Sequence, residues 1–174
     1  MTRNVAFILA LVLFGCNAPR YLVDTKVDDF DGYTRNRLYG NWVESTGDGD
    51  LRFNLQQFKQ KGGETSYSIV IHMSLMHNWF FIEDGESLIM LVEGQRIGFS
   101  GEGSINHRDT GRLLNFVYVE EMAFYDVSLE KLYEIANAKD VRLKVRGANR
   151  VKEGSFTSDN FSNLRQFLNQ YVKH

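Results

Sequence analysis

The sequence predicts an α+β fold: an antiparallel meander sheet or sandwich with two amphipathic helices near the C-terminus. Two observations indicate this class. From Arg37 to Val127 apolar residues mostly alternate with polar ones, which is the period of half-buried strands. From Ser128 onward, two stretches space their apolar residues three and four apart, which is the period of a helix. Short turns between the strands favour antiparallel neighbours.

The alternation is most regular in residues 51–56 and 67–75. The apolar residues at alternate positions are Leu51, Phe53 and Leu55 in the first segment, and Tyr67, Ile69, Ile71, Met73 and Leu75 in the second. Gly62 and Gly63, between them, can adopt the positive φ of a hairpin turn. Residues 87–92 are apolar at both odd and even positions, as in a strand covered on both faces. We therefore expect this strand and its return strand, 97–99, to lie in the centre of the sheet.

Residues 113–127 form a long predicted strand region. Around Glu120 and Glu121 the apolar residues change from one set of alternate positions to the other, as a β-bulge would produce. With the other segments it predicts a sheet of about seven to nine strands.

Two helices and one strand are predicted after this region. Ser128 can cap the first helix, and Thr157 or Ser158 can cap the second. Their apolar stripes are Leu129, Leu132, Tyr133 and Ala136, and then Phe161, Leu164, Leu168 and Tyr171. Residues 141–145 alternate as a strand between them. Both helices must lie on the sheet to bury these stripes.

The composition is that of one globular domain. Of 174 residues, 43% are hydrophobic, which is enough for a sizeable core. The 20 basic and 22 acidic residues give a net charge of -2, which disfavours nucleic-acid binding. Cys16 is the single cysteine, so neither an internal disulfide nor a cysteine-based zinc site can form.

The N-terminus has the pattern of an export signal. Arg3 supplies a positive start, residues 5–14 carry no polar side chain, and Gly15 precedes Cys16. A membrane-spanning helix needs about 20 apolar residues, so this run is too short for a permanent anchor. We therefore expect residues 1–15 to be a cleaved signal peptide. A signal peptide without lipidation and a buried strand with an idle cysteine are the alternatives.

The residues Leu13, Phe14, Gly15 and Cys16 resemble the lipobox of bacterial lipoproteins, although Phe14 stands where a small or β-branched residue is usual. The resemblance implies that Cys16 is lipidated, becomes the first residue after cleavage, and anchors the protein to a membrane of the cell envelope. Asn17 after the cysteine implies the periplasmic face of the outer membrane if the cell is Gram-negative. Residues 16–32, rich in aspartate, are expected to be a flexible tether, and residues 33–174 the globular domain.

The sequence offers no catalytic or metal-binding motif, so we expect no enzyme and no cofactor. His72 and His77 are five apart in an extended segment and point to opposite faces. The glycine-rich segment 98–104 matches neither a nucleophile elbow nor a phosphate loop. Glu120 and Glu121, as neighbours in a strand, also point apart.

Two surfaces are candidates for ligand or partner binding. Arg142, Lys144 and Arg146 are expected on one sheet face, joined by Arg150 and Lys152 across a turn, and could meet anionic groups. Trp79, Phe80 and Phe81 are contiguous, so they cannot all face one core, and an exposed ring could mark a partner or ligand site; the alternative is that the rings pack into the core on both sides of the segment.

These observations predict a lipid-anchored envelope protein that acts by binding or assembly, with the membrane and an envelope protein as its partners. The alternative is a carrier that holds an apolar small molecule or lipid in a curved-sheet cavity of at least about 300 Å3, lined by Trp79 and Phe81. A hydrolase would require a convergent polar cluster that the sequence does not reveal.

Overall fold

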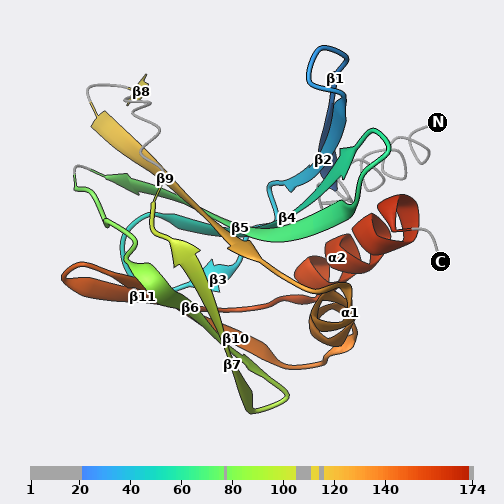
Figure 1. The fold of residues 1–174 in the computed structure, drawn as a ribbon. Helices are drawn as coiled ribbons and strands as arrows, with labels where there is room; N and C mark the ends of the chain where they lie inside the picture. The colour runs from blue at the N-terminus through green and yellow to red at the C-terminus, as the bar shows by residue number, and fades with distance from the viewer. Residues whose placement is uncertain (1–20, 77, 105–110, 114–115, 173–174) are drawn as a thin grey trace, which may run out of the picture.

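The computed structural model describes residues 21–76, 78–104, 111–113 and 116–172. Eleven strands in this part of the chain form a single sheet in which every strand pair is antiparallel, and two helices lie at one end of it (Figure 1). The predicted α+β class, an antiparallel sheet with two C-terminal helices, is confirmed.

The elements follow the predicted order with additional short strands. They are β1 (Leu22–Asp28), β2 (Tyr33–Tyr39), β3 (Glu44–Ser45), β4 (Asp50–Gln60), β5 (Thr65–Met76), β6 (Asp84–Val92), β7 (Gln95–Glu102), β8 (Gly111–Leu113), β9 (Phe116–Asp126), α1 (Leu129–Asn137), β10 (Val141–Gly147), β11 (Arg150–Ser155) and α2 (Ser158–Tyr171). The count exceeds the expected seven to nine strands because β1, β3 and β8 were not anticipated as strands of their own.

The sheet curls until its ends approach each other. Its strand order is β1-β2-β4-β5-β9-β7-β6-β10-β11-β3, with β8 beside β9. The segment that leads into β3 also runs along β4: the Val43 amide donates to the Leu51 carbonyl and the Phe53 amide to the Asn41 carbonyl, both at 2.9 Å. The short segment that ends in β3, the last strand of the order, therefore lies between β11 and β4, the third strand from the other end.

The inside of the curled sheet is filled by apolar side chains. Tyr125, Phe53 and Met90, from three different strands, are fully buried there, and Phe167 of α2 and Ile135 of α1 join the same cluster. The helices start where predicted: the Ser128 hydroxyl accepts a hydrogen bond from the Lys131 amide, and the Thr157 amide donates to the Asn160 side chain.

The tether predicted for residues 16–32 is wrong over its second half. Leu22–Asp28 is strand β1, paired with β2 from Leu22 opposite Tyr39 to Asp28 opposite Tyr33. Asp24 and Asp28 lie on the same side of the strand, so their charge is compatible with pairing, and Asp29 and Asp31 lie in the turn that follows it. The domain therefore begins before residue 33.

The bulge predicted at Glu120 and Glu121 is also wrong. The register between β5 and β9 is continuous from Ser68 opposite Asp126 to Met76 opposite Tyr118. The apolar alternation is interrupted because Glu121 occupies a position on the buried face of β9, in line with Val119 and the other core residues of that strand. A buried carboxylate thus interrupted the apolar pattern without interrupting the strand.

Candidate functional site

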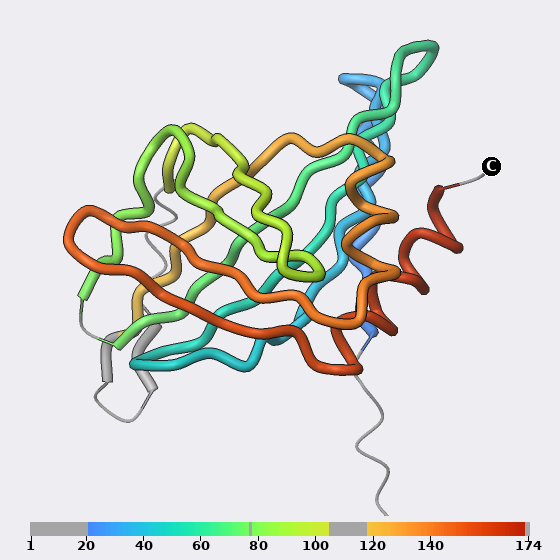
Figure 2. The backbone as a smooth tube through the Cα atoms, turned by 90° about the horizontal axis from the view of Figure 1, so that it is seen from below, coloured from blue at the N-terminus to red at the C-terminus, as the bar shows by residue number. Residues whose placement is uncertain are grey.

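The aromatic loop, residues 78–82, connects β5 to β6 at the end of the molecule remote from the helices (Figure 2). Its three aromatic residues point in different directions. Phe80 is 3% exposed and belongs to the core, whereas Phe81 is 51% exposed. The rings of Trp79 and Phe81 stack with their centroids 6.0 Å apart. The structure therefore brings together the two aromatic residues singled out from the sequence, on the outside of the fold.

A buried carboxylate holds the backbone of this loop. Glu121 is 0% exposed and accepts hydrogen bonds from three consecutive amides: Phe80 and Phe81 through Oε1 and Ile82 through Oε2, the latter two at 3.0 and 3.3 Å. A charged acceptor strengthens such bonds, and the three amide dipoles compensate a charge that burial would otherwise make costly. Glu121 is thus the residue that positions the loop.

The opposite side of the loop is held by the β10–β11 hairpin. Arg150 donates from Nη2 to the carbonyls of Asn78 and Trp79, at 3.3 and 2.9 Å, and its guanidinium lies 5.1 Å from the centre of the Phe80 ring. The Ala148 amide donates to the Phe81 carbonyl at 3.0 Å. Both the donors and the acceptors of the loop backbone are therefore fixed by side chains or strands from elsewhere in the chain.

Phe81 adopts a backbone conformation that is unusual for a bulky residue. Its φ of 55° lies in the left-handed region, where glycine or asparagine is the usual occupant. Such a residue costs of order 1–3 kcal/mol and persists only where its surroundings enforce it. The enforced conformation thus coincides with a half-exposed aromatic side chain.

The predicted basic strip is divided between two faces. Arg142, Lys144 and Arg146 do share the outer face of β10. Lys152 does not join them, because it lies opposite Val145 on the inner face, and Arg150 is engaged by the aromatic loop. The expectation that all five cations form one surface is therefore wrong. The turn lies at residues 148–149, within the predicted region. In the resulting register Val151 lies opposite Arg146 on the outer face, and Arg150 and Lys152 lie opposite Gly147 and Val145 on the inner face.

Lys152 instead fixes a turn. It is 4% exposed, and its ammonium donates to the carbonyls of Thr46, Asp48 and Gly49 at 3.3, 2.9 and 3.0 Å. Burial lowers the pKa of Lys152. Three carbonyl acceptors satisfy all three N–H donors of the group, so its role in the structure is to hold residues 46–49 against β11.

The three remaining cations border an open groove of about 750 Å3 on the outer face of β6, β10 and β11. Ile89 and Leu91 supply its apolar part. Lys144 already pairs with Glu153 at 2.7 Å, and Arg142 lies 3.9 Å from Asp140. These pairs reduce the attraction of the groove for an external anion, although no ion pair within the described part of the chain holds Arg146.

A polar cluster that sequence reasoning missed lies across β4, β5 and β9. Arg52 donates to Ser74 Oγ at 3.0 Å and contacts His72 Nδ1 at 3.2 Å, while Glu120 accepts from Ser74 at 3.1 Å and lies 3.4 Å from His72 Nε2. Burial, and then the charge of Arg52, lowers the pKa of His72. The cluster could be found from the sequence only by knowing the strand register.

This cluster is not a nucleophilic triad. In a triad the histidine bonds to the serine and the acid orients the histidine. Here Glu120 contacts both Ser74 and His72, and the other nitrogen of His72 faces the cation of Arg52 instead of a hydroxyl. His72 is therefore not placed to act as the base of Ser74, whose hydroxyl donates to the Glu120 carboxylate instead. The described residues also contain no group of three or more His, Cys, Asp or Glu side chains that could hold a metal ion.

The comparisons with known proteins found no matching family model, no matching curated protein and no matching solved structure. Function must therefore be inferred from the surfaces themselves. Neither α1 nor α2, the helices of the described residues, has the length and apolar character needed to cross a membrane. Cys16 and the predicted signal peptide, 1–15, lie outside the described residues.

Proposed function

We propose that this protein is a lipid-anchored, non-enzymatic binding protein of the cell envelope, and that the aromatic loop contacts a partner protein. The observation that carries the proposal is Phe81, half exposed in a left-handed conformation and held by the wholly buried Glu121. Aromatic side chains dominate the binding energy of many protein interfaces. A backbone that is already fixed loses little conformational entropy on binding, which further favours this loop.

The anchor follows from the resemblance of residues 13–16 to a lipobox. Since β1 is part of the domain, only residues 17–20 separate Cys16 from Tyr21. A chain of that length spans at most about 18 Å when fully extended. A domain anchored in this way stays close to the bilayer.

The position of Tyr21 supports a protein partner over a lipid one. Its hydroxyl donates to Gln170 of α2 at 3.1 Å, so the anchored end of the domain lies beside this helix. The aromatic loop lies at the end remote from both helices (Figure 2). With the lipid attached near α2, the aromatic loop is directed away from the anchoring site and is free to meet a partner.

The carrier alternative has less support. The side chains between the sheet and the helices form one packed cluster, and Trp79 and Phe81 lie outside it. A ligand held by these two rings would therefore lie on the surface of the domain. No observation in the packing favours an internal ligand.

Affinity capture from native membranes tests this function. We would compare the unchanged protein with Phe81→Ala, Trp79→Ala and the control Phe30→Ala, because Phe30 is fully exposed at the tip of the β1–β2 hairpin. We expect the two loop variants to lose a defined envelope partner by a factor of about 30, the effect of an interface hot spot of about 2 kcal/mol. Equal capture by Phe81→Ala and Phe30→Ala would contradict the role of the loop.

The anchor is tested separately by intact-mass analysis of the protein made in its native host. We expect a chain that begins at Cys16 and carries added acyl mass. An uncut leader and an unmodified thiol would remove the envelope location from the proposal and leave the binding loop to be judged by the capture experiment alone.

A further inference from the structure

Strand β1 forms one end of the sheet. Its only strand neighbour among the described residues is β2, so its outer edge presents backbone donors and acceptors that no described strand satisfies. Edge strands of this kind pair readily with another strand unless a charge, a proline or a covering element prevents it. The pattern of charges on β1 shows which strand would fit.

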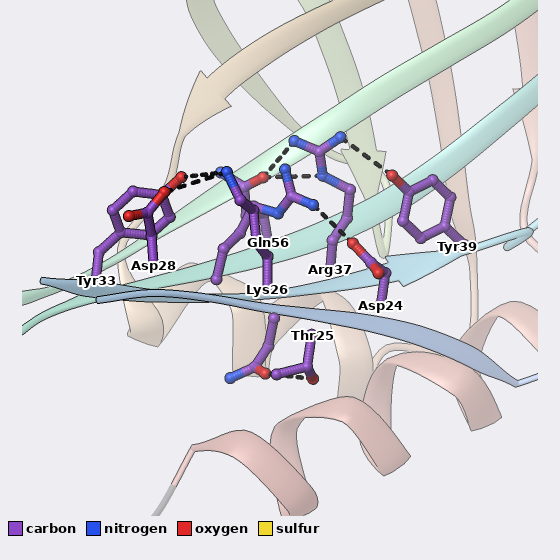
Figure 3. Close-up of polar contacts among 10 residues, drawn as sticks. Asp24, Thr25, Lys26, Asp28, Tyr33, Arg37, Tyr39 and Gln56 are labelled. Carbon is purple, nitrogen blue, oxygen red and sulfur yellow. Dashed lines mark hydrogen bonds and ion pairs between the residues drawn. The ribbon is translucent and has the colours of Figure 1, made fainter. Parts of the chain in front are cut away.

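The two faces of β1 differ in chemistry. Asp24, Lys26 and Asp28 project from one face, and Thr25 projects from the other (Figure 3). Val27 shares the face of Thr25 and is 62% exposed, so α2 leaves this part of the strand accessible. The charged side chains are accessible as well: Lys26 is 51% and Asp24 49% exposed.

We propose that β1 pairs with β1 of a second copy of this chain, in antiparallel orientation, with Thr25 of both copies at the two-fold axis. Cross-strand neighbours in an antiparallel pair lie on the same face. In this register Asp24 lies opposite Lys26 of the second copy, and Lys26 opposite Asp24. On the other face Val23 lies opposite Val27 and Thr25 opposite Thr25. From Val23 to Val27 every pair is thus matched in charge or polarity, and Leu22 lies opposite Asp28 at the two ends of the paired segment.

The neighbouring registers that keep the same faces together are disfavoured by charge. An axis at Asp24 brings the two Asp24 carboxylates together. An axis at Lys26 brings the two ammonium groups together and places Asp24 opposite Asp28. Like charges directly opposite each other destabilise a strand pair. The sequence of β1 therefore selects both the partner, which is itself, and the register.

The ion pairs within one copy do not prevent this arrangement. Asp24 pairs with Arg35 at 2.6 Å, and Lys26 lies 3.4 Å from Asp28 and donates to the Tyr33 hydroxyl at 3.0 Å (Figure 3). These are exposed pairs, which contribute little and exchange easily. Each charged group retains room for a second neighbour across the axis.

A charge exchange tests the proposal on the full chain by sedimentation over a range of concentrations. We expect the unchanged protein to form a dimer, and Asp24→Lys or Lys26→Asp alone to weaken self-association about tenfold or more. A mixture of the two variants should restore a dimer, because each cation then lies opposite a carboxylate of the other chain. A monomer at every concentration, or a mixture no tighter than either variant, would overturn the proposal.

Cysteine cross-linking tests the register even where a charge variant folds poorly. Opposite residues in an antiparallel pair have Cα atoms about 4.5–5.5 Å apart, within the range of a disulfide. Thr25→Cys should therefore cross-link two copies under mild oxidation, with peptide mapping to distinguish this bond from one through Cys16. Val27→Cys is the control, since its two copies would lie about 13 Å apart along the strand. Equal cross-linking of both variants would exclude this register, and so would its absence in both.

Discussion

Replacing Glu121 is the most direct test of how the aromatic loop is held. In Glu121→Ala the amides of Phe80, Phe81 and Ile82 lose their acceptor. The amides of Phe80 and Ile82 are buried, and an unsatisfied buried donor costs about 1–3 kcal/mol. Two such donors amount to about 2–6 kcal/mol before the loop relaxes.

We therefore expect Glu121→Ala to lower the free energy of unfolding by about 4 kcal/mol, a large part of the roughly 5–15 kcal/mol of a typical domain. Glu121→Gln keeps one carbonyl acceptor without the charge, and we expect it to lose about half as much. Urea denaturation followed by circular dichroism measures both values. Hydrogen exchange at the amides of Phe80 and Ile82 reports whether the loss is local to the loop.

Glu120→Ala is the matched control on the same strand. Its carboxylate lies on the opposite face, partly exposed, and contacts Ser74 and His72. We expect a loss of at most about 1 kcal/mol. The reasoning is refuted if Glu121→Ala and Glu120→Ala unfold with the same free energy, or if the loop amides exchange at an unchanged rate in Glu121→Ala.

Three further predictions concern the loop and the polar cluster. Phe81→Gly relieves the left-handed conformation, so we expect it to raise the free energy of unfolding by about 1 kcal/mol in urea while abolishing partner capture; a loss of stability would contradict the assigned strain. Gly147→Ala places a methyl group 2.5 Å from the Phe80 carbonyl, and we expect it to cost about 2 kcal/mol and to change Trp79 fluorescence. The lowered pKa of His72 means that the unfolded chain binds this proton more readily, so the free energy of unfolding should fall as the pH drops from about 7 through the native pKa. His72→Gln should lose this part of the pH dependence, and an unchanged slope would show that other groups produce it.

Particular residues show how far local pattern alone reaches. The alternation of apolar residues predicts β4 and β5, and the glycines between them predict their turn. Strand period and turn conformation can be predicted in this way because each depends on residues that are neighbours along the chain. Ser128 and Thr157 marked the helix starts for the same reason. Glu121 was misread as a bulge because its partners lie about 40 residues earlier, in a loop whose path no local signal describes.

The same limit applies to the charged residues. The sequence pattern predicts Lys152 beside Arg146 on the surface. The register of the β10–β11 hairpin instead places Lys152 opposite Val145, on the inner face. The aspartates of β1 looked like a solvated spacer because composition does not reveal that a second strand lies beside them. The carbonyls that satisfy Lys152 lie more than 100 residues earlier in the chain, whereas Asp24 pairs with Arg35 of the neighbouring strand β2.

The sequence by itself determined the fold class and the positions of the main strands and helices, because period and capping are properties of neighbouring residues. It also supplied the signal pattern around Cys16, on which the proposed anchor rests. Only the tertiary structure decided which side of the sheet each charge occupies, and that the buried Glu121 carboxylate and the Arg150 guanidinium hold the backbone of the aromatic loop. Those facts depend on the register between distant strands, which the packing of the whole core fixes at once.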